Sequence, residues 1–468
     1  MDSAIYVEKQ LREAQQAFAE QNPQSQKAHL DAHHHLPGGN TRTVLHAEPF
    51  PITWIAGKEA RLTSLDGQEY IDLLGEFSAG IFGHSEPRIA KAVHQALESG
   101  WNFGGNNLLE KDFARKVCQR FGPSGIDLVR FTNSGTEANT TALAASIAIT
   151  GRKKILVFSS GYHGSTLVFP MISAQASTEL SMNLPYDFVY APYNNITETR
   201  EVINNLPRDS LAAILVEPVQ GSGGCRPAKK QFMQFLRETA TSTGAFLVVD
   251  EVMSSRLGPS GYSATLGVKA DMMTLGKYVG GGMTFGAFGG RRDVMELFDP
   301  SRKGLFHPGT YNNNVVSMSA GIVGLDIYNE EEVDRLNLLG RRLKEEVQSV
   351  LIEEQIYPTE LADPRASIIE VDRLDGTTEI EVDGLGHGSS NMPAMFITGE
   401  GSMLNIRFTG PVSKSWQALF YHHALANRIF IATRGYTPLS LRVSHADVDR
   451  YVSIVRDFVT RHRDHLRA

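Results

Sequence analysis

The sequence predicts an α/β protein with a mainly parallel central sheet, plus a smaller α+β domain made from both chain ends. Between about residues 125 and 290, short apolar runs alternate with helix-like segments. Several of these runs are apolar at every position, as in parallel strands that helices cover on both faces. Such alternation is typical of an α/β fold. Six runs are predicted as strands: 127–133, 154–160, 188–193, 212–218, 245–252 and 272–277.

The flanking segments predict the smaller domain. Residues 51–74 contain short strand-like runs joined at Asp66-Gly67, which is a hairpin signal. Residues 330–354 have the spacing of an amphipathic helix, strands follow, and a final helix begins near Asp447. We expect residues 1–80 and 336–468 to share the small domain and residues 81–335 to form the large one. The polar, glycine-rich stretch 362–395 predicts a surface insertion with a hairpin.

Composition and charge exclude several classes of partner. The 468 residues carry a formal net charge of −7, which gives no reason to expect nucleic acid or an anionic membrane surface as a partner. No apolar stretch is long enough to span a bilayer, and residues 1–21 lack the apolar core of a signal peptide. The two cysteines, Cys118 and Cys225, form no CxxC pair. We therefore expect a cytoplasmic protein.

Two loops at predicted strand ends carry polar groups. In "FTNSGTEAN" a strand ends, Ser134, Gly135 and Thr136 follow, and a helix begins. Backbone N–H groups at a helix N-terminus attract anions, and a glycine lets the backbone approach a phosphate closely. The alternative for this triplet is an ordinary helix cap. In "SSGYHG", Tyr162 and His163 occupy the next such loop, where a structural role is the more frequent one.

A carboxylate and a lysine follow two further strands. Asp250 ends the apolar run "AFLVV", so its side chain is expected to be buried and to need a cationic partner, either an arginine or a ligand. Lys277 follows "DMMTLG" and precedes several glycines. A desolvated lysine becomes a neutral nucleophile toward carbonyl groups, whereas the alternative is a lysine that extends into solvent.

These four signals together match one cofactor. Pyridoxal 5′-phosphate has a phosphate, a flat ring, a ring nitrogen that must stay protonated and an aldehyde that reacts with a lysine amine. A phosphate-binding turn, a tyrosine, a buried carboxylate and a nucleophilic lysine occur in that order on successive predicted strands. The sequence therefore predicts that Lys277 binds the cofactor covalently.

At these residues the sequence resembles the class III (fold type I) pyridoxal-phosphate aminotransferases over most of its length. The matching motifs are "NSGTEAN", "GYHG", "VEPVQG", "DEVMSSR", "LGKYVGGG" and "FHPGTYNNN". "DEVM" and "GKYVGGGMTFGAFGG" are similar to the branch of glutamate-1-semialdehyde aminomutases and β-amino-acid aminotransferases. "LPGGNTRTVL", "GNNLLEKDFARKVCQRF" and "TYNNN" are most similar to the β-amino-acid enzymes. The resemblance implies a homodimer with active sites at the interface.

The resemblance also implies how the phosphate is held. Ser134, Gly135 and Thr136 bind it within one subunit, and Thr310 reaches it from the partner subunit. Met253 lies beside the ring at a position where many family members have glutamine, although the aminomutase branch shares the methionine.

The remaining cofactor residues act on the ring and its aldehyde. The resemblance implies that Tyr162 stacks on the ring and that Asp250 pairs with the protonated ring nitrogen. Lys277 joins the aldehyde and then moves a proton between substrate and cofactor. Glu217 lies near the substrate side of the ring.

Substrate selection is expected to depend on two arginines that the resemblance singles out, Arg42 in "GGNTRTVL" and Arg434 in "IATRGYTPLS". Guanidinium groups bind carboxylates in a bidentate manner, although either arginine can instead pair with a structural acid. The adjacent histidines at 33–35 cannot readily converge on one ion, so we predict no metal site.

The predicted activity is transfer of an amino group from a β-amino acid to 2-oxoglutarate or pyruvate. Phe77, Phe82 and Tyr311 allow an aromatic donor, although they can equally be core residues. The alternatives are an aminomutase of the glutamate-1-semialdehyde type and an ω-amine:keto-acid transaminase. A protein that binds the cofactor without turnover is disfavoured, because Lys277 and Asp250 occur together.

Overall fold

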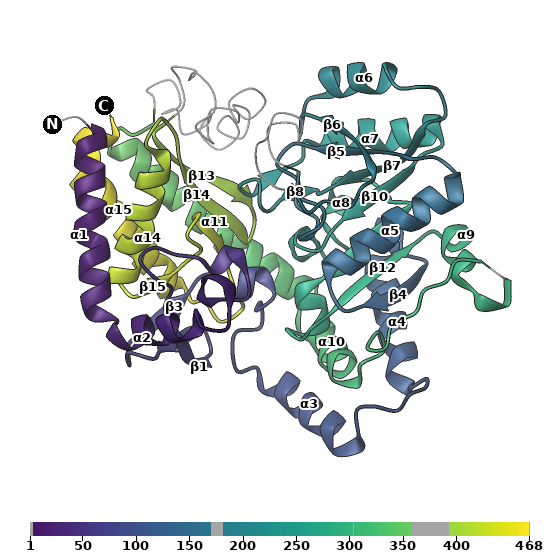
Figure 1. Cartoon of the computed structure of the whole chain (residues 1–468), viewed down its shortest axis with the longest axis horizontal. Helices are drawn as coiled ribbons and strands as arrows, with labels where there is room; N and C mark the ends of the chain where they lie inside the picture. The colour runs from purple at the N-terminus through teal and green to yellow at the C-terminus, as the bar shows by residue number, and fades with distance from the viewer. Residues whose placement is uncertain (1–2, 170–180, 303, 358–392, 468) are drawn as a thin grey trace. The chain divides into compact units, whose positions relative to one another are not determined.

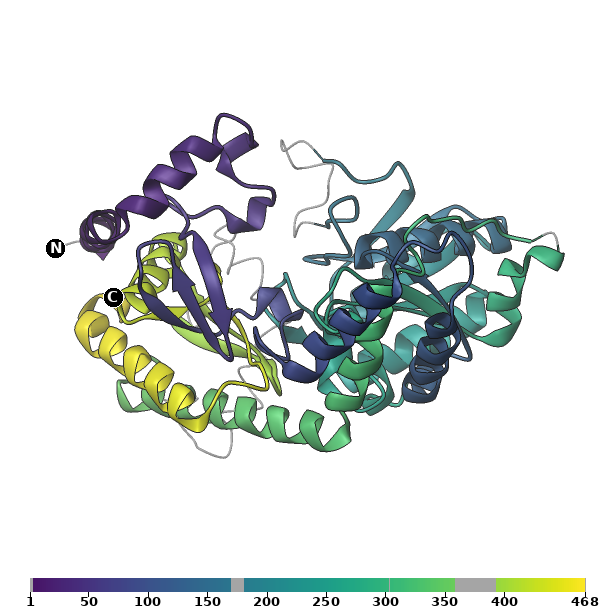
Figure 2. The same ribbon diagram turned by 90° about the horizontal axis from the view of Figure 1, so that it is seen from below.

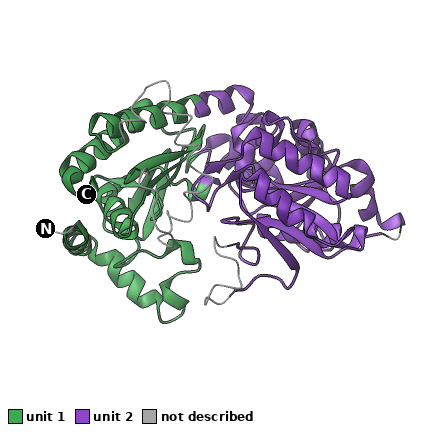
Figure 3. Ribbon diagram, turned by 90° about the horizontal axis from the view of Figure 1, so that it is seen from above, with its two compact units in different colours: residues 1–77, 83–85, 338–468 green, residues 78–82, 86–337 purple. Residues whose placement is uncertain are grey.

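The computed structural model describes residues 3–169, 181–302, 304–357 and 393–467. Its contacts divide the chain into two compact units (Figure 3). Unit 1 comprises residues 1–77, 83–85 and 338–468, and unit 2 comprises 78–82 and 86–337. The insertion predicted at 362–395 lies outside the described residues apart from its last three positions.

Unit 2 is built on one seven-stranded sheet, and all six predicted strands form in it (Figure 1). The strands are parallel except one, which pairs antiparallel with both of its neighbours. The mainly parallel α/β fold is therefore confirmed. In sheet order the strands are β4 (Leu128–Thr132), β12 (Gly286–Gly290), β11 (Met272–Gly276), β10 (Phe246–Asp250), β7 (Leu211–Val216), β5 (Lys154–Phe158) and β6 (Asp187–Ala191).

The antiparallel strand β12 is missing from the prediction. Its sequence, "GAFGG", has the glycine content of a loop. The glycines are required because a Cβ at Gly286 would lie 2.2 Å from the carbonyl oxygen of Ser134, and one at Gly290 would lie 2.2 Å from that of Asp271. Close approach of neighbouring backbones overrides strand propensity at this position.

Helices lie on both sides of this sheet (Figures 1 and 2). The α-helices that lie entirely in the described part of unit 2 are α3 (Pro87–Ser99), α4 (Leu108–Phe121), α5 (Gly135–Thr150), α6 (Ile196–Asn204), α7 (Lys230–Thr243), α8 (Tyr262–Thr265), α9 (Arg292–Met295) and α10 (Val315–Ile327). A short ribbon pairs β8 (Val219–Gln220) with β9 (Arg226–Pro227).

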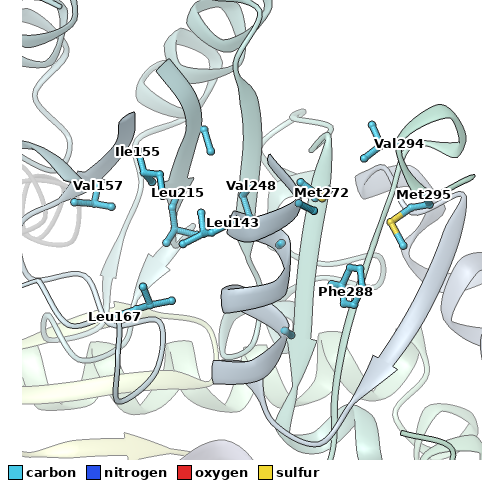
Figure 4. Packing of buried hydrophobic residues seen from close by; sticks show 14 of the residues in the cluster. Leu143, Ile155, Val157, Leu167, Leu215, Val248, Met272, Phe288, Val294 and Met295 are labelled. Carbon is cyan, nitrogen blue, oxygen red and sulfur yellow. The ribbon is translucent and has the colours of Figure 1, made fainter. Parts of the chain in front are cut away.

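The core of unit 2 lies between α5 and the central strands (Figure 4). Leu143 of α5 belongs to one buried cluster with Ile155, Leu215, Val248 and Met272, which come from four neighbouring strands, and all five are fully buried. Burying each such side chain stabilises the fold by about 1.5 to 3 kcal/mol. The cluster holds α5 on the sheet and so sets where its N-terminus lies.

Unit 1 contains both ends of the described chain. Strand β3 (Glu69–Asp72) from the N-terminal part pairs with β15 (Ile429–Phe430) from the C-terminal part, Ile71 opposite Ile429. Ser3 Oγ lies 3.4 Å from His465 Nδ1, in agreement with the adjacent chain ends in Figure 1. The turn predicted at Asp66-Gly67 is confirmed, because it joins β3 to the antiparallel strand β2 (Arg61–Ser64).

The described residues of unit 1 form two small sheets and five α-helices. The first sheet contains β1 (Trp54–Lys58), β2 (Arg61–Ser64), β3 (Glu69–Asp72) and β15 (Ile429–Phe430). The second contains β13 (Met395–Glu400), β14 (Met403–Phe408) and β16 (Tyr436–Pro438). The helices are α1 (Ser3–Gln21), α2 (Pro23–Ala32), α11 (Glu330–Glu353), which begins in unit 2, α14 (Ser413–Ala426) and α15 (His445–Leu466). In the described part of the chain, every helix is too short or too polar to cross a bilayer.

Candidate active site

Five of the predicted residues lie at the carboxyl edge of the sheet in unit 2. Lys277 directly follows β11, Asp250 ends β10, and Glu217 directly follows β7; these three strands are parallel neighbours. Tyr162 lies in the loop after β5, and Ser134 lies in the turn after β4. The carboxyl ends of parallel strands meet at one edge, which is where open α/β sheets bind their ligands.

Asp250 is buried at the centre of this edge and is held by three donors. Its Oδ2 is 2.7 Å from Asn139 Nδ2 and 2.8 Å from His163 Nδ1, and its Oδ1 accepts the Val252 N–H at 2.9 Å. An arginine partner was one predicted possibility, but a histidine and an amide occupy these contacts instead. A carboxylate has about four acceptor positions, so Oδ1 can accept one more hydrogen bond.

Asn139 is a site residue that was not predicted from the sequence. His163 is a site residue for which the sequence favoured a structural role. Asn139 Nδ2 also donates to the backbone carbonyl of His163 at 3.1 Å, while its Oδ1 accepts from Thr274 Oγ1 at 2.7 Å. The available signal was an asparagine among small apolar residues on the buried face of α5, whose buried positions include Ala138 and Ala142. A polar residue on such a face needs specific partners.

Glu217 ties two loops of the site together. Its Oε1 accepts the Tyr162 N–H at 2.9 Å, and its Oε2 accepts the Gly221 N–H at 3.0 Å. Burial raises the pKa of the Glu217 carboxyl to about 7, and the negative charge of Asp250 also raises it, while His163 and the two backbone donors oppose the shift. This carboxyl group therefore changes protonation near neutral pH.

Lys277 occupies a strained backbone position. It begins a short 3₁₀ turn (Lys277–Gly280) with φ of 54°, in the left-handed region that non-glycine residues rarely adopt. Such a conformation costs about 1 to 3 kcal/mol and is found mainly where function requires it. Its side chain is half-buried. The preceding residue, Gly276, packs on the side chain of Val252, because a Cβ there would lie 3.2 Å from Val252 Cγ1.

The N-terminus of α5 forms a close-fitting cradle. Ser134 caps the helix by accepting the Glu137 N–H at 3.1 Å, so the predicted cap and the predicted anion site are the same turn. Gly164, with φ of 124°, leaves only 2.3 Å between a hypothetical Cβ and Thr136 Oγ1. The loop after β5 therefore lies directly against the first turn of α5, where free N–H groups attract an anion.

The other predicted cofactor residues of unit 2 lie in loops and turns. Tyr162 is 39% exposed, so its ring is open to stacking by a ligand. Met253 packs over Gly221, where a Cβ would lie 2.2 Å from Met253 Sδ. Thr310 is exposed in a loop that an Asn133 Nδ2 to Asn312 Oδ1 hydrogen bond of 3.1 Å holds in place.

The two predicted substrate arginines belong to unit 1. Arg42 is exposed, its Nη1 donates to Glu76 Oε1 at 2.6 Å, and its guanidinium lies 5.6 Å from the Phe77 ring centroid. The expected alternative, an ion pair with an acid of the protein, is therefore realised for Arg42. Arg434 is half-buried in the turn before β16.

Of the three aromatic residues considered for the substrate, one is a core residue. Phe82 is only 3% exposed, and a Cβ at Gly324 of α10 would lie 2.9 Å from its Cζ. Tyr311 is exposed, and Phe77 contacts Arg42.

The residues at this edge fit pyridoxal 5′-phosphate. The cradle at Gly135 and Gly164 suits a phosphate, and Tyr162 presents an open ring. Asp250 keeps acceptor capacity for a protonated ring nitrogen, and Lys277 supplies the amine that an aldehyde requires. This donor set can hold the cofactor and transfer a proton beside it.

Three comparisons relate the chain to known proteins. A family model described as Aminotransferase class-III matches residues 45–358. Beta-phenylalanine transaminase of Variovorax paradoxus is 40% identical in an alignment of 467 positions that covers 97% of each chain. The solved structure of a β-phenylalanine aminotransferase from that organism superposes with a TM-score of 0.85 over 98% of both chains. A glutamate-1-semialdehyde 2,1-aminomutase of Hyperthermus butylicus is 37% identical in an alignment of 328 positions that covers 68% of this chain and 76% of that one.

Proposed function

Because the chain belongs to the class III aminotransferases, which depend on pyridoxal 5′-phosphate, we propose that it transfers an amino group from a β-amino acid to 2-oxoglutarate or pyruvate. The observation that carries the proposal is the 40% identity, over 97% of both chains, to a protein named Beta-phenylalanine transaminase. An aromatic β-amino acid is therefore the preferred donor.

The residues at the sheet edge hold the cofactor in this proposal. Ser134, Gly135 and Thr136 bind the phosphate with the N–H groups of the first turn of α5. Tyr162 stacks on the ring, beside Met253. When bound, pyridoxal 5′-phosphate supplies an electron sink that stabilises negative charge on the carbon bearing the amino group.

Asp250, Lys277 and Glu217 carry out the remaining tasks. Asp250 Oδ1 would accept a hydrogen bond from the protonated ring nitrogen, and His163 with Asn139 keeps the carboxylate oriented. The Lys277 amine would hold the cofactor through its aldehyde, and Nζ would take up and return the proton at the substrate carbon. Glu217 fixes the position of the Tyr162 loop through its hydrogen bond to the Tyr162 N–H, on the substrate side of the ring.

We propose that the enzyme is a homodimer in which Thr310 reaches the phosphate of the partner subunit. An exposed apolar surface of unit 2 supports this proposal. A groove of about 770 Å³ is lined by residues of α3, the loop that follows it, the start of α4 and α10. Phe103 of the loop and Leu108 of α4 are 55% and 78% exposed. In the loop that carries Thr310, Phe306 is 90% exposed. Large exposed apolar patches mark protein interfaces.

Arg42 and Arg434 are proposed to bind the carboxylates of the donor and the acceptor. The Arg42–Glu76 pair is solvent-exposed, and exposed pairs contribute only about 0 to 1 kcal/mol, so a substrate carboxylate can displace Glu76. Two carboxylate-binding arginines suit an enzyme that binds two different acids in turn.

A panel of amino donors tests the proposal. Purified enzyme is given α-, β- and ω-amino donors with 2-oxoglutarate or pyruvate, and the products are identified. We expect 3-amino-3-phenylpropanoate to react fastest, with one keto acid consumed for each donor. Rearrangement of glutamate-1-semialdehyde without keto-acid consumption would instead establish an aminomutase. The similarity to the Hyperthermus butylicus aminomutase is the reason for testing this alternative. Equal rates for simple amines would establish an ω-amine transaminase.

The arginine variants test how substrates are bound. Arg42→Ala and Arg434→Ala should raise KM for acids by about 10- to 100-fold, as expected for a lost charge-assisted contact of about 1.5 to 3 kcal/mol, and spare 1-phenylethylamine. Arg450→Ala, at an exposed position of α15, is the matched control and should change nothing. Equal losses for 1-phenylethylamine and 3-amino-3-phenylpropanoate would mean that both arginines are structural.

A further inference from the structure

Two histidines converge at the end of α2 in unit 1. His29 lies in the last turn of α2, and His33 is the residue that caps it, so the pair is spaced i, i+4 on one helical face. Their Nε2 atoms are 3.1 Å apart, and the rings meet edge to face with centroids 4.6 Å apart. Both side chains therefore direct the same ring nitrogen toward one point.

The spacing of these nitrogens matches two ligands of a single metal ion. Zinc lies about 2.0 to 2.1 Å from a histidine nitrogen, so two ligands at a tetrahedral angle are about 3.3 Å apart. The observed separation requires only a small adjustment. Both Nε2 atoms cannot carry protons at this distance, so at least one already presents its lone pair.

We propose that His29 and His33 form a two-histidine site for a divalent transition-metal ion of the zinc class. Imidazole suits Zn²⁺, Ni²⁺ and Cu²⁺, and two histidines one helical turn apart are a recurring zinc-binding arrangement. Across the described ranges, no group of three or more potential ligands converges, so water completes the coordination.

The site includes His33 but not its neighbours in the "HHH" run. His34 and His35 follow His33 in the turn, are exposed, and are not one helical turn from His29. His34 and His35 are therefore left out of the proposed site, which pairs His33 with the histidine four positions earlier.

Metal binding at this pair is expected to restrain the loop that leads to Arg42. Gly39 packs onto both rings, because a Cβ there would lie 2.8 Å from His29 and 2.9 Å from His33. The next residue, Asn40, accepts the Arg42 N–H through its Oδ1 at 3.1 Å. Fixing the two rings should therefore reduce the motion of residues 36–42.

Titration of Zn²⁺ into untagged, chelator-treated holoenzyme tests the proposal. Calorimetry should give one Zn²⁺ per chain in the wild type, and His29→Gln and His33→Gln should each weaken binding by at least about tenfold. The matched control is the double variant His34→Gln/His35→Gln, which should retain wild-type affinity. Circular dichroism of each variant checks folding, and His33 is exposed, so His33→Gln decides the test if His29→Gln folds poorly.

Hydrogen exchange gives a second readout that does not depend on activity. Zn²⁺ should slow amide exchange in residues 33–42 of the wild type and of the control, but not in either single variant. Absence of Zn²⁺ binding in the wild type would mean that the contact is only an N–H···N hydrogen bond, and equal loss in the control would place the metal on the "HHH" run. Either result would overturn the proposal.

Discussion

Glu217 is a buried carboxyl group whose ionisation should affect the stability of the fold within an accessible pH range. Burial raises its pKa from an ordinary 4.5 to about 7 in the folded protein. Below pH 4.5 the group is protonated in both states, and its contribution to stability is fully present. As the pH rises through the unfolded value toward 7, the unfolded chain releases the proton first, so stability is lost.

The size of this effect follows from the two pKa values. Between about pH 5 and pH 8, the difference in proton binding at Glu217 should lower the free energy of unfolding by about 2.5 kcal/mol. Glu217→Gln removes the ionisation. Its amide also places an NH₂ group against one of the two backbone donors, which costs about 1 to 3 kcal/mol at every pH. The variant should therefore be less stable at low pH and lose less stability as the pH rises.

Guanidinium unfolding of the apoprotein, followed by circular dichroism at a series of pH values, measures this difference. Subtracting the variant from the wild type cancels the other titrating groups, including Glu251, whose pKa burial also raises. The exposed Glu201 provides the matched control, because Glu201→Gln should reproduce the wild-type pH dependence. Parallel curves for wild type and Glu217→Gln would refute the assignment of a raised pKa to Glu217.

Four further substitutions probe the site. Asn139→Leu removes one hydrogen bond to the buried Asp250 carboxylate and one to the His163 carbonyl, and should cost about 3 kcal/mol in guanidinium unfolding. Thr274→Val removes one neutral hydrogen bond and should cost about 1 kcal/mol, and equal costs would contradict the network. Gly164→Ala places a Cβ 2.3 Å from Thr136 Oγ1 at a φ of 124°, so dialysis should remove the cofactor at least about tenfold faster, and unchanged retention would argue against the cradle. Thr310→Val should weaken cofactor affinity by about 1 to 3 kcal/mol in equilibrium dialysis. A fully active monomer in light scattering would exclude the role proposed for Thr310 across subunits.

The local pattern of the sequence was sufficient to predict most of the sheet. Runs such as "KILVF" and "FLVVD" are apolar at nearly every position, and this property belongs to the strand itself rather than to its neighbours. Strand β12 could not be predicted in the same way. Its glycines are explained by the carbonyl groups of Ser134, Leu128 and Asp271, which lie against it after folding.

The order of the chemical groups of the site along the chain can be predicted from the sequence alone. A lysine or an aspartate directly after a buried strand lies at the carboxyl edge of a parallel sheet, wherever that strand is placed. The positions of Asp250 and Lys277 follow from this rule. The geometry of the proposed metal site at His29 and His33 cannot be predicted by this rule. It depends on how the helix ends and on which ring nitrogens face each other.

The hydrogen-bond partners of Asp250 and the pKa of Glu217 were decided by the tertiary structure. The sequence required that Asp250 have a partner, but a buried charge can be satisfied by any donor that folding brings within about 3 Å. Here Asn139 and His163, more than 80 positions away, supply that contact. The raised pKa of Glu217 likewise results from burial and from the charge of Asp250 on a neighbouring strand. Hydrogen bonds and desolvation act over a few ångströms, so they depend on distances that only the folded chain defines, whereas apolar patterning is a property of consecutive residues.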